Sequence, residues 1–123
     1  MPKNRKGQIK KLDRLAREIV LKRDNNTCQK CGKYVEKQNA HISHVVPKSK
    51  GYALRWDLNN LKVLCFHCHI NWWHKNPIEA AEWFQEKFPE RAEYLYDHRY
   101  DLIDSHERDE FIEKKIEEFE NLL

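Results

Sequence analysis

Two cysteine pairs constrain this chain more than any other feature of its sequence. Cys28 and Cys31 enclose two residues, as do Cys65 and Cys68, and these four are all the cysteines in the 123 residues. Each pair can present two thiolates on one turn, and two pairs complete a closed tetrahedral zinc site. Because a chain this short buries only a limited apolar core, we expect that zinc to be a structural staple. Such a site has no open position, so any catalysis must use other residues.

The alternative for the cysteines is a buried or disulfide-bonded role, and the expected compartment argues against disulfides. The segment from Met1 to Lys11 has no apolar stretch typical of a secretory signal. No apolar run approaches the roughly 20 residues that span a bilayer. We therefore predict an intracellular chain without a membrane partner, in a reducing compartment where metal binding is the commoner use of cysteine.

Charge is distributed very unevenly along the chain. Residues 1–75 contain 17 Lys and Arg against 5 Asp and Glu, whereas residues 76–123 contain 6 against 15. The basic part indicates a polyanionic partner such as nucleic acid. We expect the acidic part to face away from that partner.

Apolar spacing and turn residues predict a strand, loop, strand, helix order around the cysteines, preceded by an amphipathic helix. A basic arm, Pro2 to Gly7, comes before that first helix, and Gly32 is expected to take a positive φ in the first cysteine turn. The expected elements are a helix at Gln8–Arg23, strands at Asn39–Val46 and Leu61–Leu64, and a helix from the second cysteine pair to Lys75.

The acidic part of the chain is predicted to be helical. Asn76 and Pro77 form a helix start, and a capping box at Asp104–Glu107 precedes a last helix that ends at Leu122. The helices between these signals are expected at Ile78–Phe88 and Pro89–Tyr96. The apolar stripe of the last helix leaves three uses open: packing on the first helix, pairing in a homodimer, or docking a phage protein.

The residues between and beside the cysteine pairs resemble a known motif. The run AHISHVVPKS at residues 40–49, followed by NLKVLC at residues 60–65 and by Cys68 and His69, is similar to the HNH, or ββα-metal, nuclease motif. The segment LRWD at residues 54–57 is similar to the phage NinG family of recombination proteins. The resemblance covers about residues 28–69.

The resemblance implies an α+β fold, with a zinc-stapled ββα-metal core, an N-terminal helix and a C-terminal helical extension. We interpret residues 1–123 as a single HNH nuclease domain, made of a basic arm and helix (1–27), the zinc-containing core (28–75) and an acidic helical extension (76–123). The implied function is metal-dependent hydrolysis of DNA phosphodiester bonds in phage DNA recombination or processing. A phage-encoded protein would work in the host cytoplasm.

The same resemblance assigns roles to individual residues. His44 becomes the general base that activates water, a task that suits an imidazole because its ordinary pKa lies near neutral pH. Asn60 would brace the loop between the strands and orient His44. His69 becomes a ligand of a catalytic Mg²⁺ or Mn²⁺. Many family members have Asp or His where this chain has Ser43, so His41, on the same strand face, is an alternative ligand.

Several further residues are candidates for contacts with metal or DNA. His74 is another candidate ligand, and the remaining histidines, His67, His98 and His106, are interpreted as surface or supporting residues. The expected phosphate contacts are Lys48, Lys50, Arg55 and Lys62, joined by Lys10, Lys11, Arg14 and Arg17 on the first helix. The aromatic residues Trp72, Trp73, Trp83, Phe84 and Phe88 are expected to pack the core rather than stack on bases.

Two non-enzymatic alternatives remain from the sequence. A zinc module that only binds DNA would keep the cysteines and the basic residues, but it has no need of His44, Asn60 and His69 together. An adaptor that docks a partner through the last helix is the other alternative.

Overall fold

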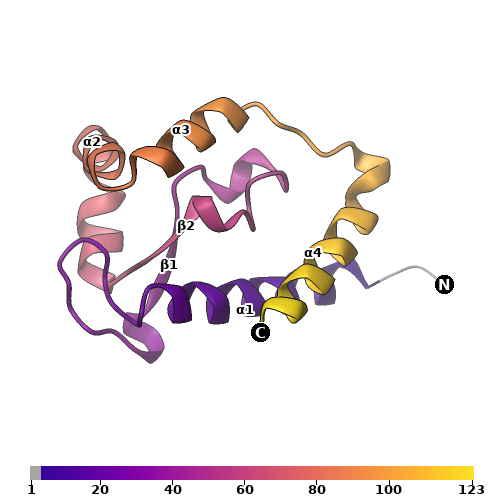
Figure 1. Ribbon diagram of the computed structural model, residues 1–123, viewed down its shortest axis with the longest axis horizontal. Helices are drawn as coiled ribbons and strands as arrows, with labels where there is room; N and C mark the ends of the chain where they lie inside the picture. The colour runs from indigo at the N-terminus through magenta and orange to yellow at the C-terminus, as the bar shows by residue number, and fades with distance from the viewer. Residues whose placement is uncertain (1–3) are drawn as a thin grey trace.

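The structure is a computed structural model that describes residues 4–123, and it combines helices with one small sheet (Figure 1). The α-helices are α1 (Arg5–Arg23), α2 (Pro77–Lys87), α3 (Pro89–His98) and α4 (Arg108–Leu122). The two strands are β1 (His41–His44) and β2 (Leu61–Leu64), and a π-helical segment, η4, covers His67–Trp73. The predicted strand, loop, strand, helix order is confirmed.

Helix α1 begins earlier than the sequence analysis predicted. Asn4 caps it by accepting a hydrogen bond from the Gly7 amide at 2.9 Å, so Arg5 to Gly7 are helical rather than part of a basic arm. The rest of the proposed arm, residues 1–3, lies outside the described residues. The helix ends at Arg23, as predicted, with Asp24 as its C-cap, and Asn25 and Asn26 then take positive φ angles of 55° and 51°.

The strands form an antiparallel hairpin in which His41 lies opposite Leu64 and His44 opposite Leu61. Strand β1 is shorter than predicted at both ends. A 3₁₀ turn occupies residues 37–39, and beyond His44 the backbone turns to pair with Asn60. All four residues of β2 are buried, because helices cover both faces of this short sheet.

One apolar core lies between α1, the hairpin and α4. Its fully buried members include Leu12, Val20, Val63, Ile112 and Phe119. Helix α4 lies beside α1 (Figure 1). The apolar stripe of the last helix is therefore used inside the chain, the first of the three alternatives.

The acidic last helix forms ion pairs with the basic first helix. Glu120 of α4 pairs with Lys11 at 3.2 Å, and Asp109 pairs with Arg5 at 2.7 Å. The predicted capping box is wrong, because a 3₁₀ turn at residues 105–107 precedes α4 and the Asp104 side chain makes no capping hydrogen bond.

A second, smaller core joins α2, α3 and the segment that follows β1. Leu54, Phe84 and Leu95 are its buried members, and Trp73, Trp83 and Phe88 pack against them. This arrangement confirms that these aromatic side chains serve packing. Within residues 4–123, no helix combines the length and apolar character needed to cross a membrane.

Candidate metal centre and active site

The four cysteine thiols converge on one point. All four Sγ atoms lie within 4.8 Å of one another, and Cys31 Sγ is 3.9 Å from Cys65 Sγ. Four sulfurs that each lie about 2.3 Å from a zinc ion would be about 3.8 Å apart. No disulfide joins the cysteines. The donor set therefore fits a structural zinc.

The electrostatics of the thiols also fit a bound cation. Burial raises the pKa of Cys68, and the adjacent sulfurs of Cys65 and Cys28 raise it further. Four thiolates this close repel one another, so all four can ionise together only around a positive charge. A bound zinc ion would supply that charge.

Local backbone structure brings the two cysteine pairs together. Gly32 takes a φ of 78°, as predicted, and its amide donates to the Cys28 carbonyl at 2.9 Å, closing the first turn. The Gln29 amide donates to the Val63 carbonyl at 2.9 Å, which ties this turn to β2. The second pair follows β2 directly, so the strand delivers it to the first.

Three histidines form a row beside the cysteine cluster. His41 Nδ1 lies 2.9 Å from His69 Nδ1, and His74 Nε2 lies 3.1 Å from His69 Nε2. His41 Nε2 must donate to the Gln38 carbonyl at 3.0 Å, so in the neutral row His41 Nδ1 accepts from His69 and His69 Nε2 accepts from His74. Two nitrogens about 3 Å apart are the kind of donor pair that a divalent transition metal uses.

The π-helical backbone of η4 explains why His69 and His74 meet. The His74 amide donates to the His69 carbonyl, five residues earlier, at 3.2 Å. This wider turn places positions i and i+5 on one face. Burial lowers the pKa of His69 to about 4, helped by the neighbouring His74 and His41, so the ring stays neutral and can act as a ligand.

His44 lies on the opposite strand face, in a separate cavity of about 200 Å³ that Asp13, Arg17, Lys48 and Arg55 also line. Its Nε2 donates to the Arg55 carbonyl at 3.0 Å, which leaves Nδ1 as the unprotonated nitrogen. Burial lowers the pKa of His44 to about 4, and the positive charges of Lys48 and Arg55 contribute. The imidazole is therefore neutral at physiological pH, so its Nδ1 is available to accept a proton.

Asn60 is fully buried and holds both ends of the loop between the strands. Its Oδ1 accepts from the Val46 amide at 2.6 Å, while its Nδ2 donates to the carbonyls of Val46 at 3.0 Å and Leu54 at 2.9 Å. The Leu54 carbonyl immediately precedes Arg55, whose own carbonyl accepts from His44. Asn60 thus fixes the backbone that orients the His44 ring.

The structure overturns one predicted DNA contact. Lys62 is fully buried, and its Nζ donates to Ser43 Oγ at 3.0 Å and lies 3.4 Å from the centre of the Trp73 ring. Burial lowers the pKa of Lys62 well below its usual value, and Arg91 adds to this effect. Because β2 is covered on both faces, a lysine there cannot reach a phosphate.

Of the other predicted phosphate contacts, Arg17, Lys48 and Arg55 line the His44 cavity. Lys48 and Lys50 are exposed, and Arg55 is partly buried. Arg55 donates to Asp13 at 2.9 Å, but its buried Nε has no hydrogen-bond partner among the described residues. On α1, Arg17 donates to the Ala40 and Lys37 carbonyls, so part of its hydrogen-bonding capacity holds the segment that leads into β1.

Three supporting residues were missed by the sequence analysis. Asp13 accepts from Trp56 Nε1 at 2.7 Å, and Arg23 donates to the Leu58 and Leu61 carbonyls at 2.7 and 2.6 Å. Asp24 accepts from the Val63 amide at 3.0 Å. These bonds tie α1 to the hairpin and its loop. No local pattern in the sequence marks them, because each joins positions more than 30 residues apart.

Comparison with known protein families gives a match for the central segment of the chain. Residues 28–71 match the family model described as HNH endonuclease, a region that contains both cysteine pairs, the hairpin and the start of η4. No curated protein and no solved structure matches the chain significantly. The match, the mixed helical and two-stranded structure and the clustered cysteines together support membership of this segment in the HNH superfamily.

Proposed function

We propose that this chain is a metal-dependent endonuclease that hydrolyses DNA phosphodiester bonds. The observation that carries the proposal is the match of residues 28–71 to HNH endonucleases, in a segment where His44 has an unprotonated ring nitrogen and lines a cavity together with Lys48 and Arg55. A water molecule and a phosphate are the groups that such a cavity accommodates.

In this proposal, His44 Nδ1 removes a proton from the attacking water. The new bond forms between the water oxygen and phosphorus, and the bond from phosphorus to the 3′ oxygen breaks; the departing 3′ oxygen takes a proton from solvent, which gives 5′-phosphate and 3′-hydroxyl ends. Lys48 and Arg55 hold the phosphate and offset the negative charge that develops on it. Asn60 acts as a positioning residue through the backbone of Arg55.

His69 and His41 would hold the catalytic ion through their Nδ1 atoms, and His74, which faces Nε2 of His69, is an alternative partner of His69 rather than a third ligand of the same ion. A divalent ion held there would supply Lewis-acid stabilisation to a phosphate that spans the histidine row and the His44 cavity, which lie on opposite faces of β1. We propose Mg²⁺ or Mn²⁺ as this ion. The four cysteines would hold a separate structural zinc.

The biological setting that we propose is phage DNA recombination or processing, and the whole of residues 1–123 is proposed to act as one nuclease domain. The support for this setting is the LRWD segment at residues 54–57, with its likeness to the NinG family. Arg55 and Trp56 of that segment build one wall of the His44 cavity.

A second candidate function is zinc-dependent DNA binding without cleavage. The observation that favours it is the Ser43 and Lys62 pair. Many HNH sequences have a metal-binding Asp or His at the position of Ser43, whereas here a buried amine lies against a hydroxyl. A site with this substitution could retain DNA affinity while its affinity for the catalytic ion is reduced.

Nicking of supercoiled plasmid separates the two candidates. The zinc-loaded chain and its His44→Ala variant would be compared with added Mg²⁺ or Mn²⁺, and His106→Ala, which changes an exposed histidine, serves as the control. We expect cleavage by the parent and by His106→Ala, with a rate reduced about 100-fold or more in His44→Ala.

DNA affinity and zinc content must be measured on the same preparations. If all three proteins bind DNA and retain zinc but none nicks plasmid with either ion, the binding module is the better account. If His44→Ala nicks at the parental rate, the role proposed for His44 is wrong.

A further inference from the structure

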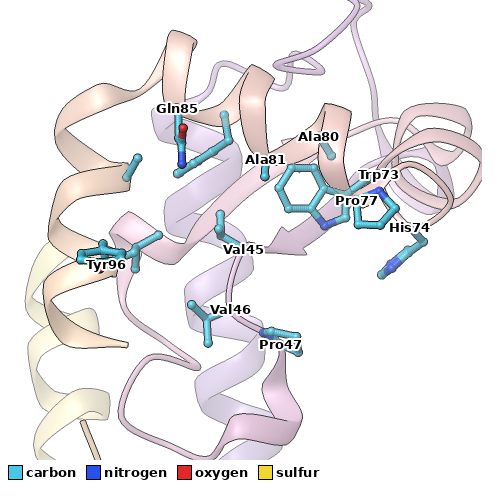
Figure 2. A pocket seen from close by; sticks show the side chains of 13 residues that line it. Val45, Val46, Pro47, Trp73, His74, Pro77, Ala80, Ala81, Gln85 and Tyr96 are labelled. Carbon is cyan, nitrogen blue, oxygen red and sulfur yellow. The ribbon is translucent and has the colours of Figure 1, made fainter. Parts of the chain in front are cut away.

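Two cavities of the structure differ sharply in charge. One, of about 420 Å³, lies between the segment after β1, the end of η4, α2 and α3, and no Asp, Glu, Lys or Arg among the described residues lines it (Figure 2). The His44 cavity, of about 200 Å³, is lined by three cations and one carboxylate: Arg17, Lys48, Arg55 and Asp13. A carboxylate repels a phosphate, so the presence of Asp13 in a cavity proposed to bind one requires a physical reason.

Both carboxylate oxygens of Asp13 are held by two consecutive residues of the loop between the strands. Oδ1 accepts from Trp56 Nε1 at 2.7 Å, and Oδ2 accepts from Arg55 Nη2 at 2.9 Å. The Trp56 side chain is buried in the main core, so it fixes one end of the carboxylate. The Arg55 guanidinium carbon lies 5.1 Å from the centre of the Trp56 ring. The same indole therefore contacts both members of the ion pair.

Arg55 contributes both its backbone and its side chain to the candidate site. Its carbonyl accepts from His44 Nε2 at 3.0 Å, and its guanidinium lines the His44 cavity. The side chain is only 19% exposed, so the cation has lost most of its water and depends on a partner. Within residues 4–123, Nη2 is bonded to Asp13 and the buried Nε has no partner. The guanidinium therefore retains donors for a phosphate.

We propose that Asp13 is a positioning residue, which fixes the Arg55 guanidinium at the His44 cavity for contact with a DNA phosphate. This inference rests on the proposed function, and it extends the candidate site to α1, outside the residues 28–71 that match the family. A guanidinium that is already held in place loses less conformational freedom when it binds a phosphate. Asp13 thus increases phosphate affinity although its own charge opposes it.

The test is the DNA affinity of the zinc-loaded full chain, measured by fluorescence anisotropy of a short labelled duplex without added Mg²⁺ or Mn²⁺. Asp13→Asn removes the charge and leaves one accepting oxygen, so it can keep only one of the two bonds. Asp13→Glu keeps the charge but moves the carboxylate by one methylene. Glu18→Gln is the matched control, because Glu18 is on the same helix, lies outside the cavity and pairs with Arg14 at 3.5 Å.

We expect Asp13→Asn and Asp13→Glu each to weaken DNA binding about fivefold, the effect of losing one charge-assisted hydrogen bond. Charge alone predicts the opposite for Asp13→Asn, because removing a negative group beside a phosphate site strengthens binding. It also predicts no change for Asp13→Glu. Glu18→Gln should bind DNA at least as tightly as the parent. Unchanged or tighter binding by either Asp13 variant would overturn the inference.

A double-mutant cycle tests whether Asp13 acts through Arg55. In an Arg55→Gln background, Asp13→Asn should no longer weaken DNA binding, because the group that Asp13 positions is gone. The same loss of affinity in both backgrounds would mean that Asp13 serves the fold in general, and the positioning role would be wrong. Thermal midpoints, measured on every variant, verify that each protein remains folded.

Plasmid nicking with added Mn²⁺ on the same preparations tests the nuclease separately. With a parent that cleaves, we expect Asp13→Asn to raise KM about fivefold, in line with its loss of affinity. If no protein cleaves while the binding results agree with the expectation, only the proposed function is contradicted. If the parent cleaves and Asp13→Asn has the parental affinity and KM, only the role of Asp13 is contradicted.

Discussion

At the scale of single residues, the His44 ring sets the pH range in which the proposed reaction can run. Its pKa is lowered from the ordinary value of 6.5 to about 4, first by burial and then by Lys48 and Arg55. A base must be unprotonated to accept a proton, so lowering the pKa extends activity toward acid.

We therefore predict that kcat/KM for DNA cleavage stays constant from about pH 8 down to about pH 5 and falls only near pH 4. The measurement is a series of initial rates at constant ionic strength, with far-UV circular dichroism as the check that the chain remains folded. A decline with a midpoint near 6.5 would mean that the essential base is an exposed histidine rather than His44.

The buried contact between Lys62 and Ser43 leads to a second prediction, which concerns the free energy of unfolding. Lys62 is a fully buried amine whose only hydrogen bond in the described residues is to Ser43. Replacing both with apolar residues, as Lys62→Met with Ser43→Ala, should raise the free energy of unfolding at pH 7 by about 1–4 kcal/mol. Ser43→Ala alone should lower it by about 1–3 kcal/mol, because the amine then loses its partner.

Urea denaturation measures both variants, and its pH dependence supplies the check. Because the pKa of Lys62 is lower in the folded chain than in the unfolded chain, the parent gains stability as the pH rises toward 10.5. The advantage of the double variant should shrink over that range. A double variant less stable than the parent at pH 7 would show that the pair stabilises the fold.

Residue type and spacing predicted much of the site but not the burial of individual side chains. The convergence of the four cysteines followed from two C-x2-C pairs, and the contact between His41 and His69 followed from placing one on a strand and one at the following helix. The burial of Lys62 could not be predicted, because LKVL looks like a strand with one polar face. The helices that cover that face lie far along the chain.

At the scale of elements, the hairpin and η4 depend on the cysteine cluster for their positions. Cys65 and Cys68 lie at the junction between β2 and η4, and Cys28 and Cys31 lie in the turn that is bonded to β2. In small metal domains the free energy of metal binding is largely free energy of folding.

We predict one zinc per chain, and we predict that Cys31→Ser lowers both zinc content and the thermal midpoint. Elemental analysis and thermal denaturation check these outcomes, with Thr27→Ser as a control at a nearby residue outside the cluster. A zinc-free chain whose far-UV spectrum and thermal midpoint equal those of the loaded chain would contradict the structural role.

The sequence predicted the starts of α2 and α3 correctly, because residues at those positions in the chain set the start of each helix. Asn76 and Pro77 start α2 as expected, and Pro89 starts α3. The predictions failed where a single side chain decides the boundary. Asn4 extends α1 by three residues, and Asn60 takes over the hydrogen bonding of Val45 and Val46 that would otherwise have lengthened β1.

At the scale of the whole molecule, the acidic α4 completes the core that the basic α1 begins. Phe119 and Ile112 are fully buried against α1 and the hairpin. The pairing of opposite charges between the two helices lies at the surface, where each ion pair contributes little. Apolar packing therefore provides most of the stability of this contact.

We predict that Phe119→Ala lowers the free energy of unfolding by about 3–5 kcal/mol. Glu120→Ala, which removes only the exposed pair with Lys11, should change it by less than about 1 kcal/mol. Urea denaturation measures both. Equal effects of the two substitutions would show that charge pairing, rather than packing, holds α4 in place.

The central claim is that this chain cuts DNA with a second divalent ion, separate from the cysteine-bound zinc. The most direct measurement is single-turnover cleavage of end-labelled DNA by the zinc-loaded chain, before and after addition of Mn²⁺ or Mg²⁺. We predict no cleavage by the zinc-loaded chain alone, and cleavage to 5′-phosphate and 3′-hydroxyl ends once the second ion is added. Folded, zinc-loaded protein that binds this DNA but leaves it intact with either ion would contradict the claim.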